Sequence, residues 1–196
     1  VFHSSRPGGF GAADIWVSRW EHDHWTEPEN AGPGVNTQDH EVDPSLSPDG
    51  STMFLSRSVF GGATAVSKLP PGADKQTDLY VSHFRDGRWT KAERIPEPVC
   101  LREAAEYRAV LSRDGNRLYF GSDRAGGYGG FDLYVSHRTT TGGWGEPENL
   151  GPLVNTAGKE VDAAIAPHEN TLVLAFLKQG GAAGKPASPV RRAVSA

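Results

Sequence analysis

The sequence predicts an all-β chain: a β-propeller-type array of four-stranded antiparallel blades, with about three blades present, and therefore a partial propeller. The first observation is an internal repeat, because residues 1–14 align without a gap on residues 119–132, at an offset of 118. The second is a middle copy, in which residues 78–82 repeat the Asp-Leu-Tyr-Val-Ser stretch of residues 132–136. Periods of this size, with short strand patterns inside them, indicate propeller blades.

Composition limits the classes of protein that this chain can belong to. Its 196 residues, 37% of them hydrophobic, are enough for one domain with a buried core. A net charge of -4 with scattered basic residues argues against nucleic-acid binding. No apolar run reaches the length of a transmembrane segment. The single Cys100 excludes an internal disulfide and a multi-cysteine zinc site, and we predict no cofactor and no metal.

The repeat boundaries give the domain organisation. The chain starts in the middle of a repeat, so we expect it to be a piece of a longer protein. Residues 178–196 are rich in Gly, Ala and Pro and are predicted to form a flexible tail. Residues 1–177 are predicted to form the propeller domain, with repeat fragments at 1–40, 41–105, 106–159 and 160–177.

The first strand of each repeat is predicted to begin at a glutamate, over residues 41–47, 106–112 and 160–166. Regular alternation would place Val42, Pro44 and Leu46 on one side of the first of these strands. A tight turn should follow, because Asp-Gly pairs supply a side-chain hydrogen bond and a positive φ. Such pairs stand at 49–50 and 114–115.

The remaining three strands follow from the same comparison. The second strand is the apolar one, at 53–55, 118–120 and 172–174. A glycine-rich connection then leads to an aspartate that opens the third strand. The fourth strand is predicted to begin at a tryptophan that packs between blades, because Trp buries much apolar area; these residues are Trp25, Trp89 and Trp144.

The repeated aspartates Asp14, Asp78 and Asp132 are predicted to be structural anchors. Carboxylates also serve catalysis and metal binding, but a residue that recurs in every blade belongs to the scaffold, whereas an active site should break the repeat. Arg6 and Arg124, eight residues before two of these aspartates, are the expected ion-pair partners.

The glutamates at the head of each first strand are candidate binding residues: Glu41, Glu106 and Glu160. Two interpretations stay open. The first strand of a propeller blade lines the central channel, so these carboxylates could form an acidic ring that attracts a cation. Alternatively, each glutamate caps the loop that precedes it.

Three aromatic residues outside the repeat pattern are the preferred ligand contacts: Trp20, Phe60 and Tyr128. Phe60 lies in an insertion, because the connection over residues 58–77 is eleven residues longer than its counterparts. Loops that vary in length between fixed strands commonly carry specificity in repeat folds. Strand polarity places this insertion on the same face as the connections at 33–38 and 152–158. We expect a partner on that face and an inert opposite face, which carries the Ser-Pro-Asp-Gly turn.

The repeated motifs resemble a known family. The series Ser-x-Arg-x-Gly-Gly-x-Gly-x-x-Asp, Trp-x-x-Pro-x-Asn-x-Gly, Val-Asn-Thr and Ser-Pro-Asp-Gly recurs over residues 1–177. It resembles the WD-like β-propeller repeats of the TolB family, especially bacterial envelope versions fused to an OmpA-like peptidoglycan-binding domain. This resemblance implies a non-catalytic binding scaffold, periplasmic or extracellular, in a family that usually has six blades.

The functional prediction is a β-propeller binding scaffold without chemistry, with a protein or glycan ligand on the loop face. Self-association is also expected, because an open arc of blades leaves apolar faces uncovered. The alternative is a propeller carbohydrate-active enzyme, sialidase-like or lyase-like, since residues 47–52 are similar to the Asp-box turn of sialidases. Glycoside hydrolysis needs two carboxylates around one pocket, and the sequence does not single out such a pair.

Overall fold

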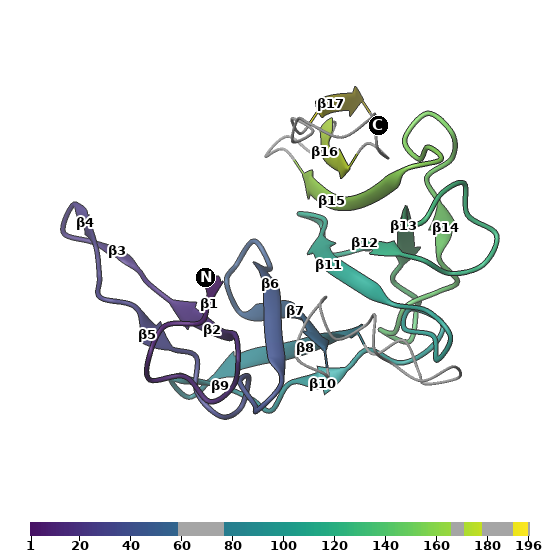
Figure 1. Ribbon diagram of the computed structural model, residues 1–196. Coiled ribbons are helices and arrows are strands. Elements are labelled where there is room, and N and C mark those ends of the chain that lie inside the picture. The colour runs from purple at the N-terminus through teal and green to yellow at the C-terminus, as the bar shows by residue number, and fades with distance from the viewer. Residues whose placement is uncertain (59–76, 166–170, 178–189, 196) are drawn as a thin grey trace.

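The computed structural model describes residues 1–58, 77–165, 171–177 and 190–195. Every described element is a β-strand, and the strands pair antiparallel in four blade-like sheets that follow one another along an arc (Figure 1). In this part of the chain, no helix is long and apolar enough to cross a membrane. The prediction of an all-β partial propeller is therefore confirmed.

The first blade has the strand order β1-β2-β5, and a separate β3-β4 hairpin extends from it. The second blade has the order β10-β8-β7-β6, with β9 paired to β8. The strands of these two blades are β1 (Phe2–Ser4), β2 (Asp14–Val17), β3 (Trp20–Glu21), β4 (His24–Trp25), β5 (Glu29–Asn30), β6 (His40–Leu46), β7 (Thr52–Ser58), β8 (Thr77–Arg85), β9 (Arg88–Trp89) and β10 (Glu93–Arg94).

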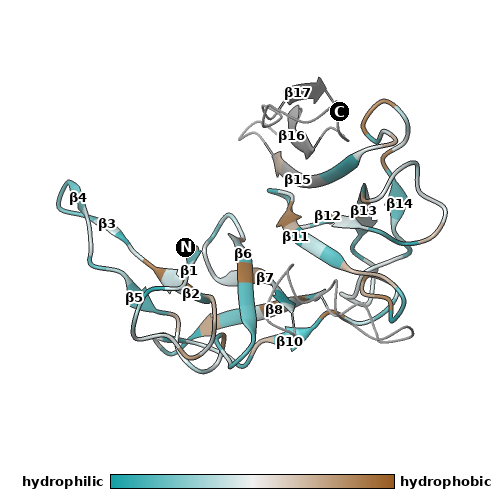
Figure 2. Cartoon of the chain, viewed as in Figure 1, coloured by the Kyte–Doolittle hydropathy of each residue, from teal (hydrophilic) through white to brown (hydrophobic). Residues whose placement is uncertain are grey.

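The third blade has the order β11-β12-β13-β14, and the fourth sheet has the order β15-β16-β17. The first and second strands lie where the repeat predicted them. Figure 2 shows that the short outer strands β5, β10 and β14 are hydrophilic, as expected at the solvent-facing edge of each blade. The strands of these two sheets are β11 (Glu106–Leu111), β12 (Arg117–Ser122), β13 (Asp132–His137), β14 (Glu148–Asn149), β15 (Lys159–Ile165), β16 (Thr171–Leu177) and β17 (Val190–Ser195).

The turn between the first and second strands is held by its aspartate. In the second blade the Ser47 hydroxyl donates to Asp49 Oδ1 at 2.5 Å, and the Ser51 amide donates to the same oxygen at 3.0 Å. Gly50 follows with φ 72°, a left-handed conformation that glycine adopts without a steric penalty. The third blade repeats these contacts through Ser112 and Asp114.

The regular alternation predicted for the first strand is wrong, because a β-bulge interrupts it. The pairing of β6 with β7 shifts register between Val42 and Ser45, and Asp43 has φ 52°. The equivalent Arg108 of β11 has φ 57°, and its guanidinium lies 3.2 Å from the Asp43 carboxylate. A bulge kinks a strand and changes the direction of its side chains. The ion pair between the two bulge residues joins the first strands of neighbouring blades.

The core lies in the seams between blades. Ile15 and Val35 of the first blade pack with Met53 and Leu55 of the second in one buried cluster. A larger cluster joins the second and third blades, with Phe54, Leu79, Ile95, Leu118 and Phe120 among its members. Each blade therefore buries its apolar residues against its neighbours, as stacking in a repeat fold requires.

The tryptophans do not begin the fourth strands. Trp25 and Trp89 lie on β4 and β9, and Trp144 forms a bridge with Arg138, all of them before the outer strands β5, β10 and β14. Trp89 and Trp144 are partly buried against the two seams, as predicted, whereas Trp25 is 64% exposed. In each of these blades a short hairpin extension separates the third strand from the fourth. The amino-acid composition alone did not indicate these extensions.

The predicted flexible tail also contains an ordered element. Val190–Ser195 form β17, which pairs antiparallel with β16 from Thr171 to Phe176. The segment supplies a third strand to the fourth sheet. The repeat comparison missed it because residues 178–196 share no motif with the other blades.

Candidate functional site

The glycine-rich loops between the second and third strands are held by the aspartates that follow them. In the first blade, the amides of Phe10 and Gly11 donate to the Asp14 carboxylate at 2.9 and 3.3 Å. In the third blade, the amides of Tyr128 and Gly129 donate to Asp132 in the same way. Asp14 and Asp132 are both 1% exposed, so each carboxylate satisfies loop amides at the buried end of a strand.

These loops require glycine because their backbone passes close to neighbouring atoms. A Cβ on Gly127 would lie 2.2 Å from Asp132 Oδ2, and one on Gly9 would lie 1.7 Å from Asp14 Oδ2. A Cβ on Gly129 would lie 2.3 Å from the Gly158 carbonyl oxygen. The loop therefore packs against both its own aspartate and the connection to the next blade.

The tips of these loops expose aromatic side chains. Tyr128 is 51% exposed and Phe10 is 50% exposed. The two residues are equivalent under the 118-residue offset, so Tyr128 belongs to the repeat pattern and is not an exception to it. Leu153, on the connection from β14 to β15, is 74% exposed. Strand polarity places all three residues on the same face of the arc.

Trp20 does not lie with Tyr128. It pairs with Trp25 across the β3-β4 hairpin, their ring centroids 5.4 Å apart, at the end of the blade opposite the glycine-rich loop. Phe84 and Arg138 occupy the same position opposite Trp89 and Trp144, so Trp20 also stands at a repeat position. Phe60 and the insertion around it lie outside the described residues.

The opposite face is not featureless. A shallow hollow at the seam between the first two blades is lined by Val17, Leu46, Phe84 and Trp89, together with Val1, Ser18, Arg19 and Gly50. The lining provides mostly apolar contact. No carboxylate side chain is among its lining residues.

The glutamates at the head of the first strands cap the preceding connections. The Thr37 amide and hydroxyl donate to Glu41 at 3.0 and 2.6 Å, and Thr156 makes the same pair of bonds to Glu160 at 2.9 and 2.6 Å. These bonds confirm the capping interpretation at both positions. Glu41, Glu106 and Glu160 are all 0% exposed, so none of them forms part of the surface that a macromolecular partner could contact.

The arginines pair differently from the prediction. Arg124 contacts Glu106 at 3.4 Å and the Val99 carbonyl oxygen at 2.6 Å, and it stacks over the Tyr134 ring; Asp132 instead accepts the loop amides. Arg6 stacks over the rings of Phe2 and Trp16. Both arginines bridge strands and loops within the scaffold, so their contacts are compatible with the anchor interpretation. The observed ion-pair partner of Arg124 is Glu106, however, and not the predicted Asp132.

An asparagine ties each outer connection to the third strand in the first and third blades. Asn36 accepts from the Ile15 amide at 2.8 Å and donates to the Ile15 carbonyl at 2.9 Å. Asn155 makes the same two bonds to Leu133 at 2.8 and 2.9 Å. These are the asparagines of the Val-Asn-Thr motif, whose threonines donate to Glu41 and Glu160.

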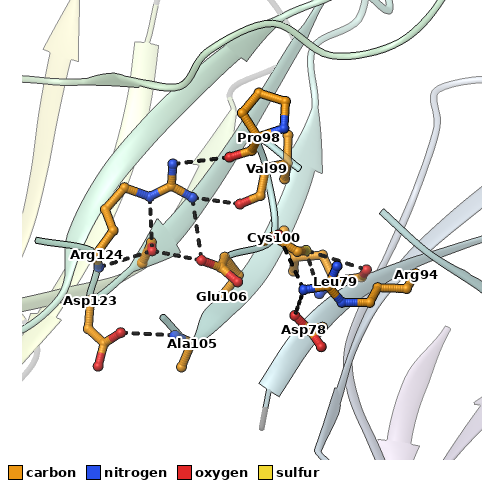
Figure 3. Close-up of polar contacts among 11 residues, drawn as sticks. Asp78, Leu79, Arg94, Pro98, Val99, Cys100, Ala105, Glu106, Asp123 and Arg124 are labelled. Atoms are coloured by element: carbon orange, nitrogen blue, oxygen red, sulfur yellow. Dashed lines mark hydrogen bonds and ion pairs between the residues drawn. The ribbon is translucent and has the colours of Figure 1, made fainter. Parts of the chain in front are cut away.

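The middle of the chain departs from this pattern around Cys100 (Figure 3). Cys100 replaces the asparagine, and its Sγ accepts from the Leu79 amide at 3.3 Å. Leu101 replaces the threonine whose hydroxyl donates to the glutamate elsewhere, and only its backbone amide remains as a donor to Glu106. Arg94 stands where the other blades have Asn30 and Asn149, and it pairs with Asp78 at 2.8 Å. Asp78 thus has an arginine partner, whereas the structure shows none for Asp14 and Asp132 among the residues it describes.

Glu106 is left partly unsatisfied by these changes. Its Oε1 accepts from the Ser122 hydroxyl at 3.0 Å and from Arg124, whereas Oε2 is buried without a hydrogen-bond partner among the described residues. Burial raises the pKa of Glu106 to about 7, against the opposing effects of the Ser122 hydroxyl, the Arg124 guanidinium and the Leu101 backbone amide. Burial also raises the pKa of the Cys100 thiol, which stays protonated at neutral pH.

Cys100 was not predicted as a site residue. The available signal was the alignment of Val99-Cys100-Leu101 on the two Val-Asn-Thr motifs, where a thiol replaces an amide. The symmetry-breaking criterion used for the aspartates would have selected this position. A count of cysteines addresses only disulfides and multi-cysteine sites, and it does not reveal a thiol in place of a repeated asparagine.

Comparison with known proteins gives structural neighbours only. No family model matches the chain, and no curated protein matches it. A structure described as TolB from Agrobacterium tumefaciens is 16% identical with a TM-score of 0.54, covering 89% of this chain and 49% of that one. The chain thus spans about half the length of this neighbour.

Two other neighbours have TM-scores below 0.5. A puromycin-hydrolysing peptidase from Mycobacterium tuberculosis is 16% identical with a TM-score of 0.47, covering 90% of this chain and 28% of that one. The periplasmic gluconolactonase PpgL from Pseudomonas aeruginosa is 14% identical with a TM-score of 0.38, covering 99% of this chain and 66% of that one.

The sheets, their order along the arc and the repeated turns define a β-propeller segment. Its likeness to the Agrobacterium protein shows a fold of the TolB-like propeller type, as the repeated motifs predicted. At this identity the likeness concerns the fold alone.

Proposed function

We propose that this propeller segment is a non-catalytic binding scaffold of the bacterial envelope, periplasmic or extracellular, which holds a protein or glycan partner on its loop face. The observation that supports this proposal is the repeated pair Phe10 and Tyr128. Each aromatic side chain is about half exposed at the tip of a loop whose backbone is fixed by a buried aspartate.

Rigid aromatic tips suit recognition for two physical reasons. Aromatic side chains bring a large contact area with few rotatable bonds, which is why they dominate binding hot spots. The loop amides are already bonded to Asp14 and Asp132, so little backbone entropy remains to be lost when a partner binds. Leu153 adds exposed apolar surface on the same face.

The experiment compares variants of the two faces. Immobilised chain is exposed to a bacterial envelope protein extract and, separately, to an array of glycans that includes peptidoglycan fragments. The double variant Phe10→Ala/Tyr128→Ala should lose at least about tenfold in affinity for whichever probe binds, since two aromatic anchors are removed. Trp20→Ala is the matched control, because it removes an aromatic of 58% exposure from the opposite face.

Both variants should retain the melting temperature of the parent, since exposed substitutions usually change stability by less than about 0.5 kcal/mol. Loss of binding in Trp20→Ala with full binding in the double variant would move the site to the opposite face. Turnover of any array glycan, measured as released reducing ends, would contradict the non-catalytic part of the proposal.

A further inference from the structure

The cluster around Cys100 combines three potential metal ligands from two blades. One ligand atom each from Asp78, Cys100 and Glu106 can be chosen so that all three lie within 4.8 Å of one another. Asp78 is the second residue of β8 in the second blade, Glu106 is the first residue of β11 in the third, and Cys100 lies on the connection between the two blades. The seam between two blades therefore brings together a thiol and two carboxyl groups (Figure 3).

A second observation points to a ligand at this place. Glu106 is 0% exposed and its Oε2 has no hydrogen-bond partner among the described residues. In Figure 3 the Glu106 carboxyl group lies between Arg124 on one side and Asp78 and Cys100 on the other. A buried carboxylate oxygen without a partner is costly and rare in folded proteins, so it needs an explanation, and a bound cation is one.

We propose that Asp78, Cys100 and Glu106 form a binding site for a thiophilic divalent cation of the zinc class. One sulfur and two oxygens suit such an ion, which binds thiolate at about 2.3 Å and carboxylate at about 2.0 to 2.2 Å. Ligand atoms around a tetrahedral ion then lie roughly 3.6 Å apart, so side-chain rotation has to close the cluster by about 1 Å. Calcium is disfavoured, because it takes about six to eight oxygen ligands.

Charge and access are compatible with a cation here. The ionised ligand set carries three negative charges, and Arg94 and Arg124 balance two of them. On binding, the Cys100 S–H bond breaks, its proton leaves to solvent, and the thiolate electron pair forms the bond to the metal without any redox change. The Asp78 side chain is 19% exposed, so the cluster is in contact with solvent at this ligand.

Cobalt(II) is the probe, because its thiolate complexes have a charge-transfer band in the near ultraviolet. Reduced, chelator-treated chain is titrated with Co²⁺, and one equivalent should bind with this band and be displaced by Zn²⁺. Cys100→Asn restores the residue that the other blades use to bond the third strand, as Asn36 and Asn155 do. This variant should keep the parental melting temperature and lose the band.

Glu106→Gln should retain the thiolate band but bind Co²⁺ at least about tenfold more weakly, since even outer-shell changes cost about 10- to 100-fold. The proposal is overturned if the parent chain shows no band up to millimolar Co²⁺, or if Cys100→Asn binds with parental affinity. In either case Cys100 serves only to replace the asparagine in backbone bonding. Parental affinity in Glu106→Gln would overturn the three-ligand assignment.

Discussion

The carboxylates of Asp14 and Asp132 satisfy loop amides that have no strand partner. Each is buried at the start of a third strand and accepts two successive backbone N–H groups from the glycine-rich loop before it. Asp132 also accepts from the Asn149 side chain at 2.9 Å, which links the loop to the outer strand. These contacts explain why an aspartate, and not merely a polar residue, recurs at this position.

Asp132→Ala should therefore lower the free energy of unfolding. Losing hydrogen bonds to a charged, buried acceptor costs about 1.5 to 3 kcal/mol, and the loop amides are left without partners. Chemical denaturation would measure the loss. Glu148→Gln, on the exposed side of β14, is the control and should change stability by less than about 0.5 kcal/mol. If Asp132→Ala unfolded at the same denaturant concentration as the parent, the loop amides would have found other hydrogen-bond partners.

Asp49 should make stability depend on pH in the acid range. The Ser47 hydroxyl, followed by the Ser51 amide and hydroxyl, lowers the pKa of Asp49 to about 2. A folded-state pKa below the unfolded value of 3.8 stabilises the fold above that value, and this contribution is lost as pH falls toward 2. The melting temperature of the parent should thus exceed that of Asp49→Asn at pH 5, and the two should converge near pH 2. A constant difference across this range would contradict the assignment.

The roles of single residues could be predicted from the sequence only where the repeat shows them. Asp14 and Asp132 were recognised as anchors because they recur, but their partners were not, since a backbone amide carries no sequence signal. Arginine was the obvious counter-charge, yet Arg124 lies beside Glu106. Cys100 was missed because its significance depends on the asparagines it replaces and on the neighbouring carboxyl groups, which only the fold brings together.

The glycine-rich loop is the element on which the proposed binding face depends. Its backbone passes so close to Asp132 that position 127 has no room for a side chain. The loop also lies against the connection to the next blade, where Phe131 bridges Lys159 and the Glu160 amide donates to the Phe131 carbonyl at 2.9 Å. Loop, third strand and next blade are therefore coupled through the backbone.

Gly127→Ala should destabilise the third blade and displace Tyr128. The new Cβ would lie 2.2 Å from Asp132 Oδ2, so the carboxylate has to move and release the loop amides. We expect a loss of about 1 to 3 kcal/mol, the usual cost of overpacking. Gly143→Ala is a matched control, because its nearest atom would be Thr139 Oγ1 at 3.6 Å, an ordinary contact. The hydrogen-exchange rate of the backbone amides in residues 126–130 should rise in Gly127→Ala and stay at the parental value in Gly143→Ala. An unchanged rate in Gly127→Ala would contradict this prediction.

At the level of elements, the strands were predictable and their irregularities were not. Apolar triplets and Asp-Gly turns located the first and second strands because burial and turn chemistry are local properties. The bulge at Asp43 and Arg108 was not visible, since non-glycine residues with positive φ carry no composition signal. The strand β17 was missed for the opposite reason: its pairing with β16 is long-range, and its sequence is unlike the rest of the repeat.

The whole molecule is held together by seams between blades. Each seam combines strand residues of two neighbouring blades with a tryptophan from the hairpin extension of the later blade, Trp89 in the first seam and Trp144 in the second. The repeat thus has a direction, because the second and third blades each contribute a tryptophan to the seam with the preceding blade. Trp25 belongs to the same series but is 64% exposed, and its partner Trp20 is 58% exposed.

This exposure predicts that the isolated chain associates with itself. Two large aromatic rings in edge-to-face contact form an apolar surface of the kind that the other blades bury. Sedimentation at roughly tens of micromolar, within the range where exposed apolar surface drives association, should show species larger than the monomer.

Trp25→Lys should shift the population toward monomer without lowering the melting temperature. Trp144→Lys should instead destabilise the chain by about 3 kcal/mol or more, because it places a charge in the second seam. A compact, stable parental monomer at these concentrations would show that the exposed pair does not drive association.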